Sequence, residues 1–422
     1  MKSFKIPYGD TFLTLEVPKK NLKAVIEPRK TEVANRSEVD LVKDALANPI
    51  FSPKLSEICK GKKDIVLITS DHTRSVPSKI TLPLLLEEIR KGSPDADISI
   101  LVATGLHRAT TKEEQRKMFG DDIVDKEKIY VHDSYDDSQM LNLGVLPNGA
   151  VFEVNKRIVE CDVLLAEGFI EPHFFAGFSG GRKSVFPGVS SHRSVSTNHS
   201  YKALASKYAT AGILENNPIH EDMLEAAKRV NLQFILNVAL DDEKKIIAAF
   251  AGDLEKAHEA GCDFIRKTAL CEPVEGDIVI TSNGGAPLDR DLYQGPKSGA
   301  AAEECAGDDG VIIMVSSCTE GFGGKNFKEL ASYGSPEEID AYLSKIPPIE
   351  SIPEQWSAQV FSRIMMKHKI ILVTEGISDE DLIKANFIPA KSLDEALEKA
   401  FALKGKDADI VVIPDGVAVL FH

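Results

Sequence analysis

The chain alternates short, unbroken apolar runs with longer amphipathic segments. In its first part, Ile65–Ser70, Ile98–Ala103 and Val163–Ala166 have the length and composition of buried strands, while Ile80–Lys91 and Leu254–Thr268 have the spacing of amphipathic helices. Unbroken apolar strands that alternate with helices are typical of parallel sheets covered on both faces. The pattern therefore predicts an α/β fold with mostly parallel sheets.

The same alternation starts again after a polar stretch, Glu272–Gly276, that has the character of a domain seam. The strand expected at Asp277–Ser282 opens the second series, and a chain of 422 residues fits two domains. We predict two α/β domains, residues 1–271 and 272–422, with the active site in the cleft between them. The last strand is a candidate for packing back on the first domain.

Charge and cysteine usage narrow the range of partners. The 65 Asp and Glu residues outnumber the 50 Lys and Arg residues, giving a net charge of −15, which argues against nucleic acid as the main partner. The six cysteines are scattered singly, as reduced thiols of a cytoplasmic protein are. The sequence has neither a signal-peptide core nor an apolar run long enough to span a membrane. We expect a cytoplasmic protein without a membrane partner, and an oligomer stays open.

Polar side chains with catalytic potential follow several of the predicted strands. In open parallel sheets, ligands bind beyond the carboxyl ends of the strands, so residues at separate strand ends can face one cleft. Each residue also has an ordinary structural explanation, since Asp71 could cap the following helix and His107 could lie in solvent. The residues at these strand ends are Asp71, His72, Thr73 and Arg74 after the first strand, His107 after the second, His173 after a third, and Tyr293, Gln294 and Lys297 in the second half.

The stretch from Glu167 to Tyr201 concentrates this chemistry. It contains three of the ten histidines, His173, His192 and His199, and the glycine-rich segment Gly177–Ser184. That segment approaches a phosphate-binding P-loop, but an arginine stands where the second glycine belongs and the preceding strand ends too early. Two alternatives stay open from these residues: a non-catalytic phosphate- or nucleotide-binding module using residues 177–184, and a conventional zinc hydrolase.

Together, the motifs resemble the nickel-pincer lactate racemase family. The resemblance covers nearly the whole chain in order and spacing, and its long middle motif is the most specific. The motifs are Asp71–Arg74, Thr104–Arg108, Glu171–Ser184, Asn198-His199 and Tyr293-Gln-x-x-Lys297. The resemblance implies an isomerase, a racemase or epimerase of small 2-hydroxy acids with lactate as the leading substrate.

The resemblance also implies a cofactor and a role for each motif. The cofactor would be the nickel(II) pyridinium-3,5-bisthiocarboxylic acid mononucleotide, attached covalently at Lys183 and built by separate maturation enzymes. His199 would complete the coordination of nickel, and His107 and His173 would act as acid and base. Asp71, His72, Thr73 and Arg74 match the segment that holds the cofactor. The residues that match the substrate-binding groups are Arg74, Tyr293, Gln294, Lys297 and the single tryptophan, Trp356.

The chemistry explains why such a site needs these residue types. The α-hydrogen of a 2-hydroxy acid leaves more readily as hydride than as a proton, and the resulting 2-keto acid is planar, so hydride can return to either face. The two enantiomers present their hydroxyl groups on different sides, and proton transfer requires close approach of about 2.6–3.2 Å, so two bases are needed. Arginine and lysine suit the substrate carboxylate.

Overall fold

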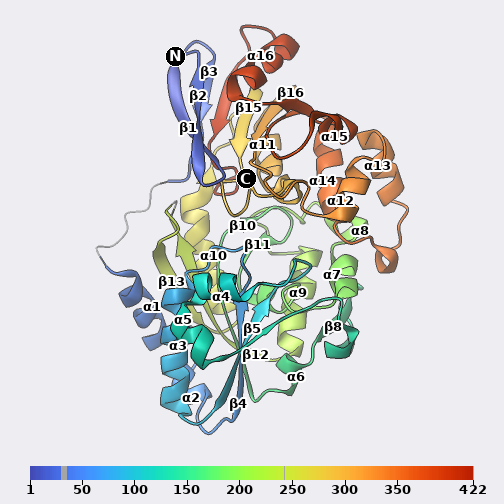
Figure 1. Ribbon diagram of the computed structural model, residues 1–422. Coiled ribbons are helices and arrows are strands. Elements are labelled where there is room, and N and C mark those ends of the chain that lie inside the picture. The colour runs from blue at the N-terminus through green and yellow to red at the C-terminus, as the bar shows by residue number, and fades with distance from the viewer. Residues whose placement is uncertain (30–35, 242, 422) are drawn as a thin grey trace.

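The computed structural model describes residues 1–29, 36–241 and 243–421, which form two lobes, each built around a six-stranded sheet (Figure 1). Most strands pair in parallel, which confirms the predicted α/β fold. None of the helices in the described part of the chain is long and apolar enough to span a membrane.

The first lobe places helices on both faces of its sheet. Its strands run in the order β13-β12-β9-β4-β5-β6, and only the β12–β13 pair is antiparallel. The strands of this sheet are β4 (Asp64–Ser70), β5 (Asp97–Ala103), β6 (Lys128–Val131), β9 (Val163–Phe169), β12 (Leu232–Leu240) and β13 (Ile246–Gly252). The helices are α1 (Glu38–Ala47), α2 (Leu55–Ile58), α3 (Ser78–Gly92), α4 (Lys112–Phe119), α5 (Asp121–Lys126), α6 (Arg157–Glu160), α7 (His192–Asn198), α8 (Tyr201–Leu204), α9 (Pro218–Arg229) and α10 (Lys256–Ala269).

Short elements extend this lobe at the carboxyl ends of its strands. The β7–β8 ribbon and the two-residue β10–β11 ribbon are both antiparallel. The β10–β11 ribbon and the 3-10 turn that follows it belong to the histidine- and glycine-rich stretch. These elements are β7 (Met140–Val145), β8 (Val151–Asn155), β10 (Pro172–His173), β11 (Gly177–Phe178), η1 (Asp137–Gln139) and η2 (Gly181–Ser184).

The second lobe has an all-parallel sheet in the order β18-β17-β16-β15-β19-β3. Its strands are β3 (Leu22–Val25), β15 (Gly276–Ser282), β16 (Ala306–Val315), β17 (Lys369–Val373), β18 (Ile388–Ala390) and β19 (Ile410–Ile413). Its helices are α11 (Pro296–Glu303), α12 (Lys325–Ala331), α13 (Pro336–Leu343), α14 (Gln355–Met365), α15 (Asp379–Lys384) and α16 (Leu393–Lys404), and its 3-10 turns are η3 (Leu292–Gln294) and η4 (Pro348–Glu350).

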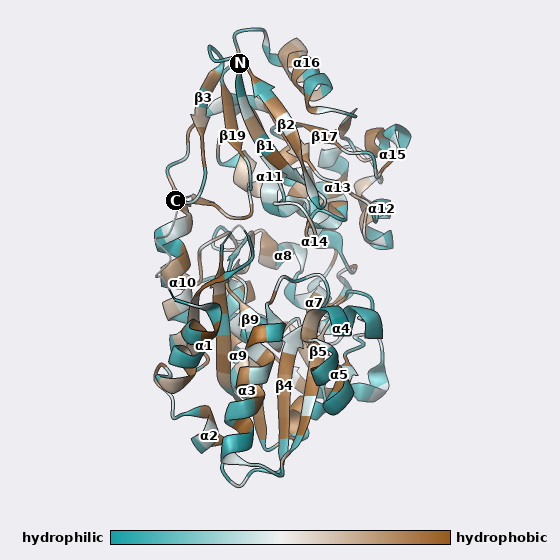
Figure 2. Cartoon of the chain, turned by 60° about the vertical axis from the view of Figure 1, so that its left-hand side comes forward, coloured by the Kyte–Doolittle hydropathy of each residue, from teal (hydrophilic) through white to brown (hydrophobic). Residues whose placement is uncertain are grey.

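Buried apolar strands hold each lobe together. The five residues at the centre of β4 and of β5 are all buried, because both faces of the sheet are covered. In Figure 2 the strands β4 and β5 are brown, while the helices α4 and α5 beside them are largely teal. The continuous apolar runs in the sequence therefore mark the sheet, and the sheet fixes the strand ends from which functional side chains project.

The N-terminal segment belongs to the second lobe. β3 pairs with β19, and the antiparallel hairpin of β1 (Lys2–Tyr8) and β2 (Thr11–Val17) packs Ile6 and Leu15 against Ile278 and Ile280 of β15. The predicted division at residues 1–271 grouped this segment with the first domain, whereas its strand pairing groups it with the second. Local sequence pattern identifies such a strand but does not specify which distant strand it joins.

The chain returns to the first lobe at its end. The short strand β20 (Leu420–Phe421) pairs in parallel with β14 (Leu270–Cys271), which directly follows α10. Leu420 lies in an apolar cluster with Ile170, Phe178 and Cys262 of the first lobe. The lobes are thus linked by the returning chain as well as by the seam that connects them.

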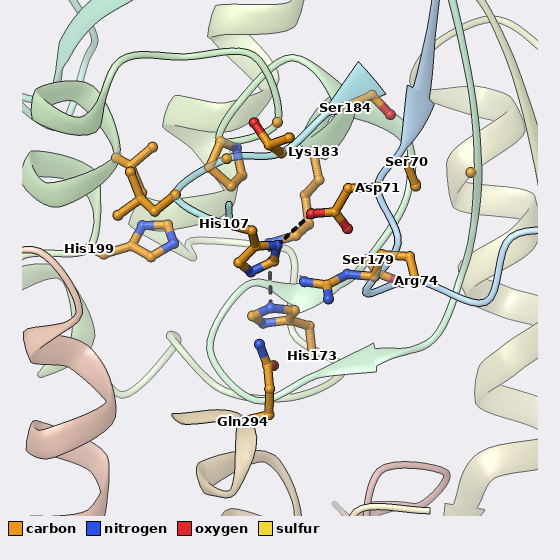
Figure 3. A pocket seen from close by; sticks show the side chains of 18 of the residues that line it. Ser70, Asp71, Arg74, His107, His173, Ser179, Lys183, Ser184, His199 and Gln294 are labelled. Carbon is orange, nitrogen blue, oxygen red and sulfur yellow. Dashed lines mark hydrogen bonds and ion pairs between the residues drawn. The ribbon is translucent and has the colours of Figure 1, made fainter. Parts of the chain in front are cut away.

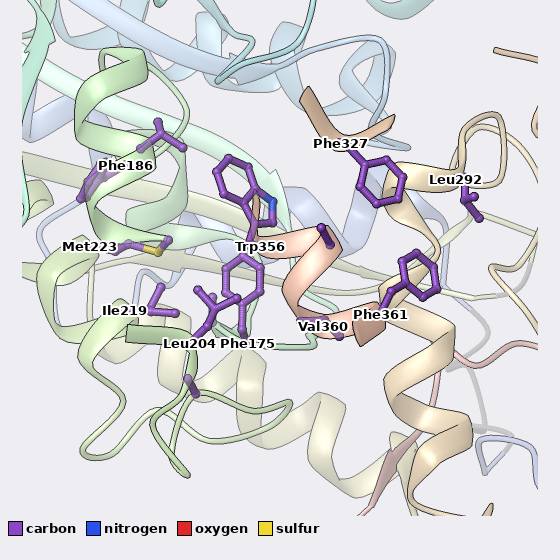
Figure 4. Packing of buried hydrophobic residues seen from close by; sticks show 14 of the residues in the cluster. Phe175, Phe186, Leu204, Ile219, Met223, Leu292, Phe327, Trp356, Val360 and Phe361 are labelled. Carbon is purple, nitrogen blue, oxygen red and sulfur yellow. The ribbon is translucent and has the colours of Figure 1, made fainter. Parts of the chain in front are cut away.

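An apolar cluster and a few polar contacts join the lobes beside the cleft (Figure 4). Phe175 and Leu204 of the first lobe share this cluster with Trp356 and Val360 of α14. The hydroxyl of Tyr201 donates to Asp340 at 3.0 Å, and a side-chain amide of α14 donates to the carbonyl oxygen of Tyr201 at 3.1 Å. These contacts hold α13 and α14 against α8, so that the two lobes face each other across one cavity.

The burial of the N-terminal hairpin gives a stability prediction. Leu15 is fully buried, so Leu15→Ala is expected to lower the free energy of unfolding by about 2–5 kcal/mol. Phe12 lies on the same hairpin but is 58% exposed, so Phe12→Ala is expected to change it by no more than about 0.5 kcal/mol. Urea unfolding monitored by the fluorescence of Trp356, which lies in the same lobe, measures both. Equal losses would contradict the packing of the hairpin on this sheet.

Candidate active site

One cavity of about 150 Å³ lies beyond the carboxyl ends of β4, β5 and β9 and is closed by residues of the second lobe. It brings together most of the residues singled out in the sequence, from four separate strand ends. Those that line it are Asp71, Arg74, His107, His173, Lys183, His199, Tyr293, Gln294, Lys297 and Trp356. His72 and Thr73 are absent from this lining.

Asp71 orients the ring of His107. Asp71 follows β4 and is 1% exposed, and its Oδ2 accepts from Nδ1 of His107 at 2.7 Å. The hydroxyl of Thr73 donates to the other carboxylate oxygen at 2.6 Å. Burial raises the pKa of Asp71, but the charge and hydrogen bond of His107, the charge of Arg74 and the bond from Thr73 outweigh it, so the net shift of this pKa is downward. With Nδ1–H bonded to a carboxylate, the other ring nitrogen of His107 is left free to exchange protons.

A buried carboxylate that the sequence analysis did not single out fixes the loop between β4 and α3. Glu167 of β9 is fully buried, and it accepts from Thr69 and Ser78, both at 2.6 Å, and from Thr81. Burial raises the pKa of Glu167 despite these three hydroxyl donors. Thr69 precedes the loop, and Ser78 begins the helix after it, so both ends of the loop that carries Asp71 are bound to one side chain. A lone glutamate inside an apolar strand is the signal that could have identified it.

The glycine-rich segment packs Lys183 into the interior. Gly177 has φ +77° and Gly181 has φ +55°, and a Cβ at Gly177 would lie 2.3 Å from the carbonyl oxygen of Ile213. Only glycine fits these positions, because L-residues with a side chain avoid this backbone region and the space is filled. The turn η2 that follows places the side chain of Lys183 in the cavity.

The adjacent arginine faces away from the cavity. Arg182 is 1% exposed, and its guanidinium donates to the carbonyl oxygens of Ala176 at 2.7 Å and Gly180 at 3.3 Å. Its other contact is with Nε2 of His258 at 3.0 Å. Arg182 therefore holds the loop's own backbone. This arrangement differs from a P-loop, in which the backbone opens towards a phosphate at the start of a helix.

The amine of Lys183 lies beside His173 without an acidic partner. Its Nζ is 3.4 Å from Nε2 of His173, and none of the ion pairs among the described residues includes it. Burial lowers the pKa of Lys183 far below its usual value, and the charges of Arg182, Arg74 and Lys297 lower it further. The backbone N–H of Ala176 donates to Nδ1 of His173 at 3.3 Å, so a neutral ring carries its proton on Nε2 and can donate it only to an uncharged amine.

A row of rings in edge-to-face contact runs from His173 to Trp356. The ring centroids of His173 and Phe175 are 4.6 Å apart, those of Phe175 and His199 are 4.8 Å apart, and those of His199 and Trp356 are 4.8 Å apart. Trp356 Nε1 donates to the hydroxyl of Tyr293 at 2.8 Å. Burial lowers the pKa of both histidines well below the usual value, with Lys183 contributing to each, so both rings are neutral near pH 7.

His199 presents one ring nitrogen with no protein partner in the described part of the chain. It ends α7, and its Nδ1 donates to the side-chain oxygen of Asn198 at 3.0 Å. That bond fixes the tautomer and leaves a lone pair on Nε2, as required of a metal-binding imidazole. Figure 3 shows the rings of His107, His173 and His199 around the same space as Lys183.

Two cations from different lobes form one wall of the cavity. Arg74 comes from the loop after β4, and its Nη1 donates to the hydroxyl of Thr73 at 2.8 Å. Lys297, in the first turn of α11, is 6% exposed, and its Nζ lies 3.7 Å from a carboxylate oxygen of Glu171. Burial lowers the pKa of Lys297 to about 8, with Glu171 opposing the shift and Arg74 adding to it. A small anion can therefore contact both cations.

The remaining predicted residues lie outside the cavity or along its edge. His72 points to Thr110, with Nδ1 at 3.1 Å from its hydroxyl. Thr73 reaches the cavity through its bond to Asp71. Gln294 lies in η3, where the carboxylate of Asp291 accepts from its backbone N–H at 3.0 Å, and burial raises the pKa of Asp291 to about 6.

Comparisons with known proteins identify the family of the chain. Residues 8–212 match the lactate racemase N-terminal domain, and residues 271–421 match the lactate racemase C-terminal domain. The lactate racemase of Thermoanaerobacterium thermosaccharolyticum is 47% identical over 422 residues, covering 100% of this chain and 99% of that protein. The lactate racemase of Lactiplantibacillus plantarum is 44% identical over 422 residues, with 100% of both chains covered.

Solved structures extend the likeness to three dimensions. The lactate racemase apoprotein of Thermoanaerobacterium thermosaccharolyticum superposes with a TM-score of 0.95 at 46% identity and covers 100% of both chains. A protein from Thermotoga maritima has a TM-score of 0.71 at 18% identity, covering 91% of this chain and 98% of its own, and shares the fold alone. The sequence relatives, both domain matches and the apoprotein structure agree, and the chain belongs to the lactate racemase family of isomerases.

Proposed function

We propose that this protein racemises small 2-hydroxy acids, with lactate as the leading substrate, through a 2-keto acid. The observation that carries the proposal is the convergence on one cavity of two neutral imidazoles, an unpaired buried amine and two cations. Its relatives named lactate racemase support the choice of substrate.

The residues of the cavity fit the nickel-pincer cofactor. A buried, uncharged amine with no acidic partner is a nucleophile able to form a covalent link, and Lys183 has this character. His199 offers a single ring nitrogen, and the described residues include no group of three His, Cys, Asp or Glu side chains that could hold a metal ion by themselves. A pincer group that brings its own sulfur ligands would need only this one protein nitrogen to complete a square-planar nickel site.

When bound, the cofactor would accept the α-hydrogen of the substrate as hydride and return it. The chain's residues would move the hydroxyl proton. His107 and His173 would form the acid–base pair: Nε2 of His107, opposite the nitrogen bound to Asp71, would act as base, and Nε2 of His173 carries a proton to donate. A neutral imidazole is the suitable base near pH 7. Because the two rings come from different strand ends, they can approach the substrate hydroxyl from different sides.

The substrate would be held by its carboxylate. Arg74 and Lys297 supply opposite charge from the two lobes, and Gln294 and Tyr293 add polar groups along the same wall. Trp356, hydrogen-bonded to Tyr293, would give the small organic chain an apolar contact. Removing water from such a site strengthens the attraction between ions.

The two alternative functions have less support. The segment 177–184 forms a ribbon and a 3-10 turn whose arginine binds its own backbone, so a phosphate-binding module lacks its expected cradle. A catalytic zinc site needs three protein ligands, and the described residues hold no such group. The cofactor proposal requires maturation enzymes as partners, and a cytoplasmic location stays an expectation from the scattered cysteines.

The covalent attachment of the cofactor at Lys183 gives the first test. Protein produced together with cofactor-building enzymes is expected to carry added mass on the peptide that contains Lys183, and Lys183→Arg is expected to carry none, since a guanidinium does not form the thioamide. Peptide mass spectrometry and nickel analysis measure both. Fully loaded, active enzyme with an unmodified Lys183 would rule out the attachment.

The acid–base pair gives the second test. His107→Ala and His173→Ala are each expected to reduce kcat by about a hundredfold to ten-thousandfold. Both variants should keep bound nickel, because neither ring is the proposed ligand. His192→Gln is the matched control, since His192 lies on α7 near His199 but outside the cavity lining. Chiral analysis of the products measures turnover, and retained racemisation in either alanine variant would remove that histidine from the mechanism.

The charge state of Lys183 gives the third test. In cofactor-free protein, acetylation of Lys183 by acetic anhydride should depend little on pH near neutrality, because the depressed pKa leaves the amine uncharged. N-acetyl-lysine amide in the same tube should lose reactivity about tenfold for each pH unit below its own pKa near 10.4. Peptide mass spectrometry between about pH 7 and pH 9 compares the two profiles. Parallel profiles would contradict an uncharged Lys183 whatever the absolute rates.

A further inference from the structure

The contact between Glu171 and Lys297 is the one ion pair that joins the two lobes among the described residues. Glu171 directly precedes β10 in the first lobe, and Lys297 belongs to α11 in the second. Their side chains are 22% and 5% exposed, so the pair is largely shielded from water. The proposed function gives Glu171 no role, although its carboxylate is paired with the lysine that would bind the substrate.

Lys297 lies among several basic side chains. Arg74, His173 and Lys183 face it from the first lobe, and the pKa values of His173 and Lys183 are lowered by its charge. The acidic groups that face Lys297 are Glu171 and Asp291, and only Glu171 forms an ion pair with it. The carboxylate of Glu171 is therefore the group that a second carboxylate, that of a 2-hydroxy acid, would have to displace from Lys297.

Glu171 has room to leave that position. It lines a second cavity of about 400 Å³, which Arg74 also borders. Its backbone is fixed, because the N–H of Glu171 donates to the hydroxyl oxygen of Ser179 at 2.8 Å and the N–H of Ser179 donates to the carbonyl oxygen of Glu171 at 2.9 Å. Glu171 lines this second cavity and not the first, so a change of side-chain rotamer that takes the carboxylate away from Lys297 can be accommodated there.

We propose that Glu171 is the resident counter-ion of Lys297 and is exchanged for the carboxylate of the substrate. This inference rests on the proposed function, since it takes Lys297 as a substrate-binding residue. Burying a charged lysine without a partner costs free energy, and Glu171 supplies that partner while no substrate is bound. An anionic acid can replace Glu171 on the lysine, whereas a neutral amide cannot. Glu171 is therefore a positioning residue that makes the site selective for acids.

The test is the variant Glu171→Gln, which removes the charge and keeps the shape. Without a competing carboxylate, L-lactate should bind about threefold to tenfold more tightly at about pH 6.5, the range expected for a partly buried ion pair. KM for lactate should fall by a similar factor while kcat stays near that of the wild type. Quenching of Trp356 in the full-length protein gives the dissociation constant, and racemisation by the loaded enzyme gives KM and kcat.

The pH dependence separates exchange from a structural effect. The pair exists only while Lys297 is protonated, so the advantage of Glu171→Gln should be complete below the lysine's pKa of about 8 and should vanish well above it. Glu243→Gln is the matched control, because Glu243 borders the same second cavity but pairs with Lys245. L-lactamide, the neutral analogue, should bind equally to the wild type and to Glu171→Gln.

Three results would overturn the exchange. They are an unchanged lactate affinity in Glu171→Gln, a weaker affinity at every pH, or an equal gain for lactamide. The variant Lys297→Met separates this inference from the function on which it rests. If Lys297→Met leaves lactate binding unchanged, Lys297 does not bind the substrate carboxylate, and the proposed exchange is wrong as well. If Lys297→Met weakens binding but Glu171→Gln has no effect, only the exchange is wrong.

Discussion

The burial of one amine without an acidic partner is the constraint on which the site depends. Lys183 lies among Arg182, Arg74 and Lys297, and burial together with these charges makes its protonated form unfavourable. An uncharged amine is a nucleophile and can accept a hydrogen bond from His173. The glycines of the loop permit the backbone to bring the lysine this deep, and Arg182 stabilises that backbone from behind. The sequence and the geometry of this loop thus together determine the protonation state of Lys183.

Rigid strand ends supply the rest of the site. Glu167 binds the residues on both sides of the loop after β4, so Asp71 and Arg74 project from a loop held at each end. Asp71 then fixes the ring of His107. Each step is a hydrogen bond accepted by a buried carboxylate, and buried carboxylates are stable only when such donors are present. The fixed positions of Asp71, Arg74 and His107 therefore follow from the hydrogen bonds that buried polar groups require inside the first lobe.

The sequence predicted the parts of the molecule that depend on local pattern. Strands buried on both faces read as continuous apolar runs, so the position of β4 and the location of Asp71 beyond it could be inferred. The pairing of β3 with β19 could not, because partner choice in a sheet depends on contacts between distant segments. The direction of a side chain is also set by tertiary contacts: Arg182 and Lys183 are adjacent in the same motif, yet only the lysine faces the cavity.

The placement of charge explains why the site lies between two lobes. A first lobe alone would expose Lys183, His173 and Arg74 to water, where electrostatic effects are weak. Closure by α11 and α14 shields these groups from water and adds Lys297, whose charge is coupled to that of Arg74. The apolar contact of Phe175 with the cluster around Trp356 holds the lobes together without adding charge. The low proton affinity of the buried amine and of the buried imidazoles is therefore a consequence of their enclosure between the two lobes, next to other basic groups.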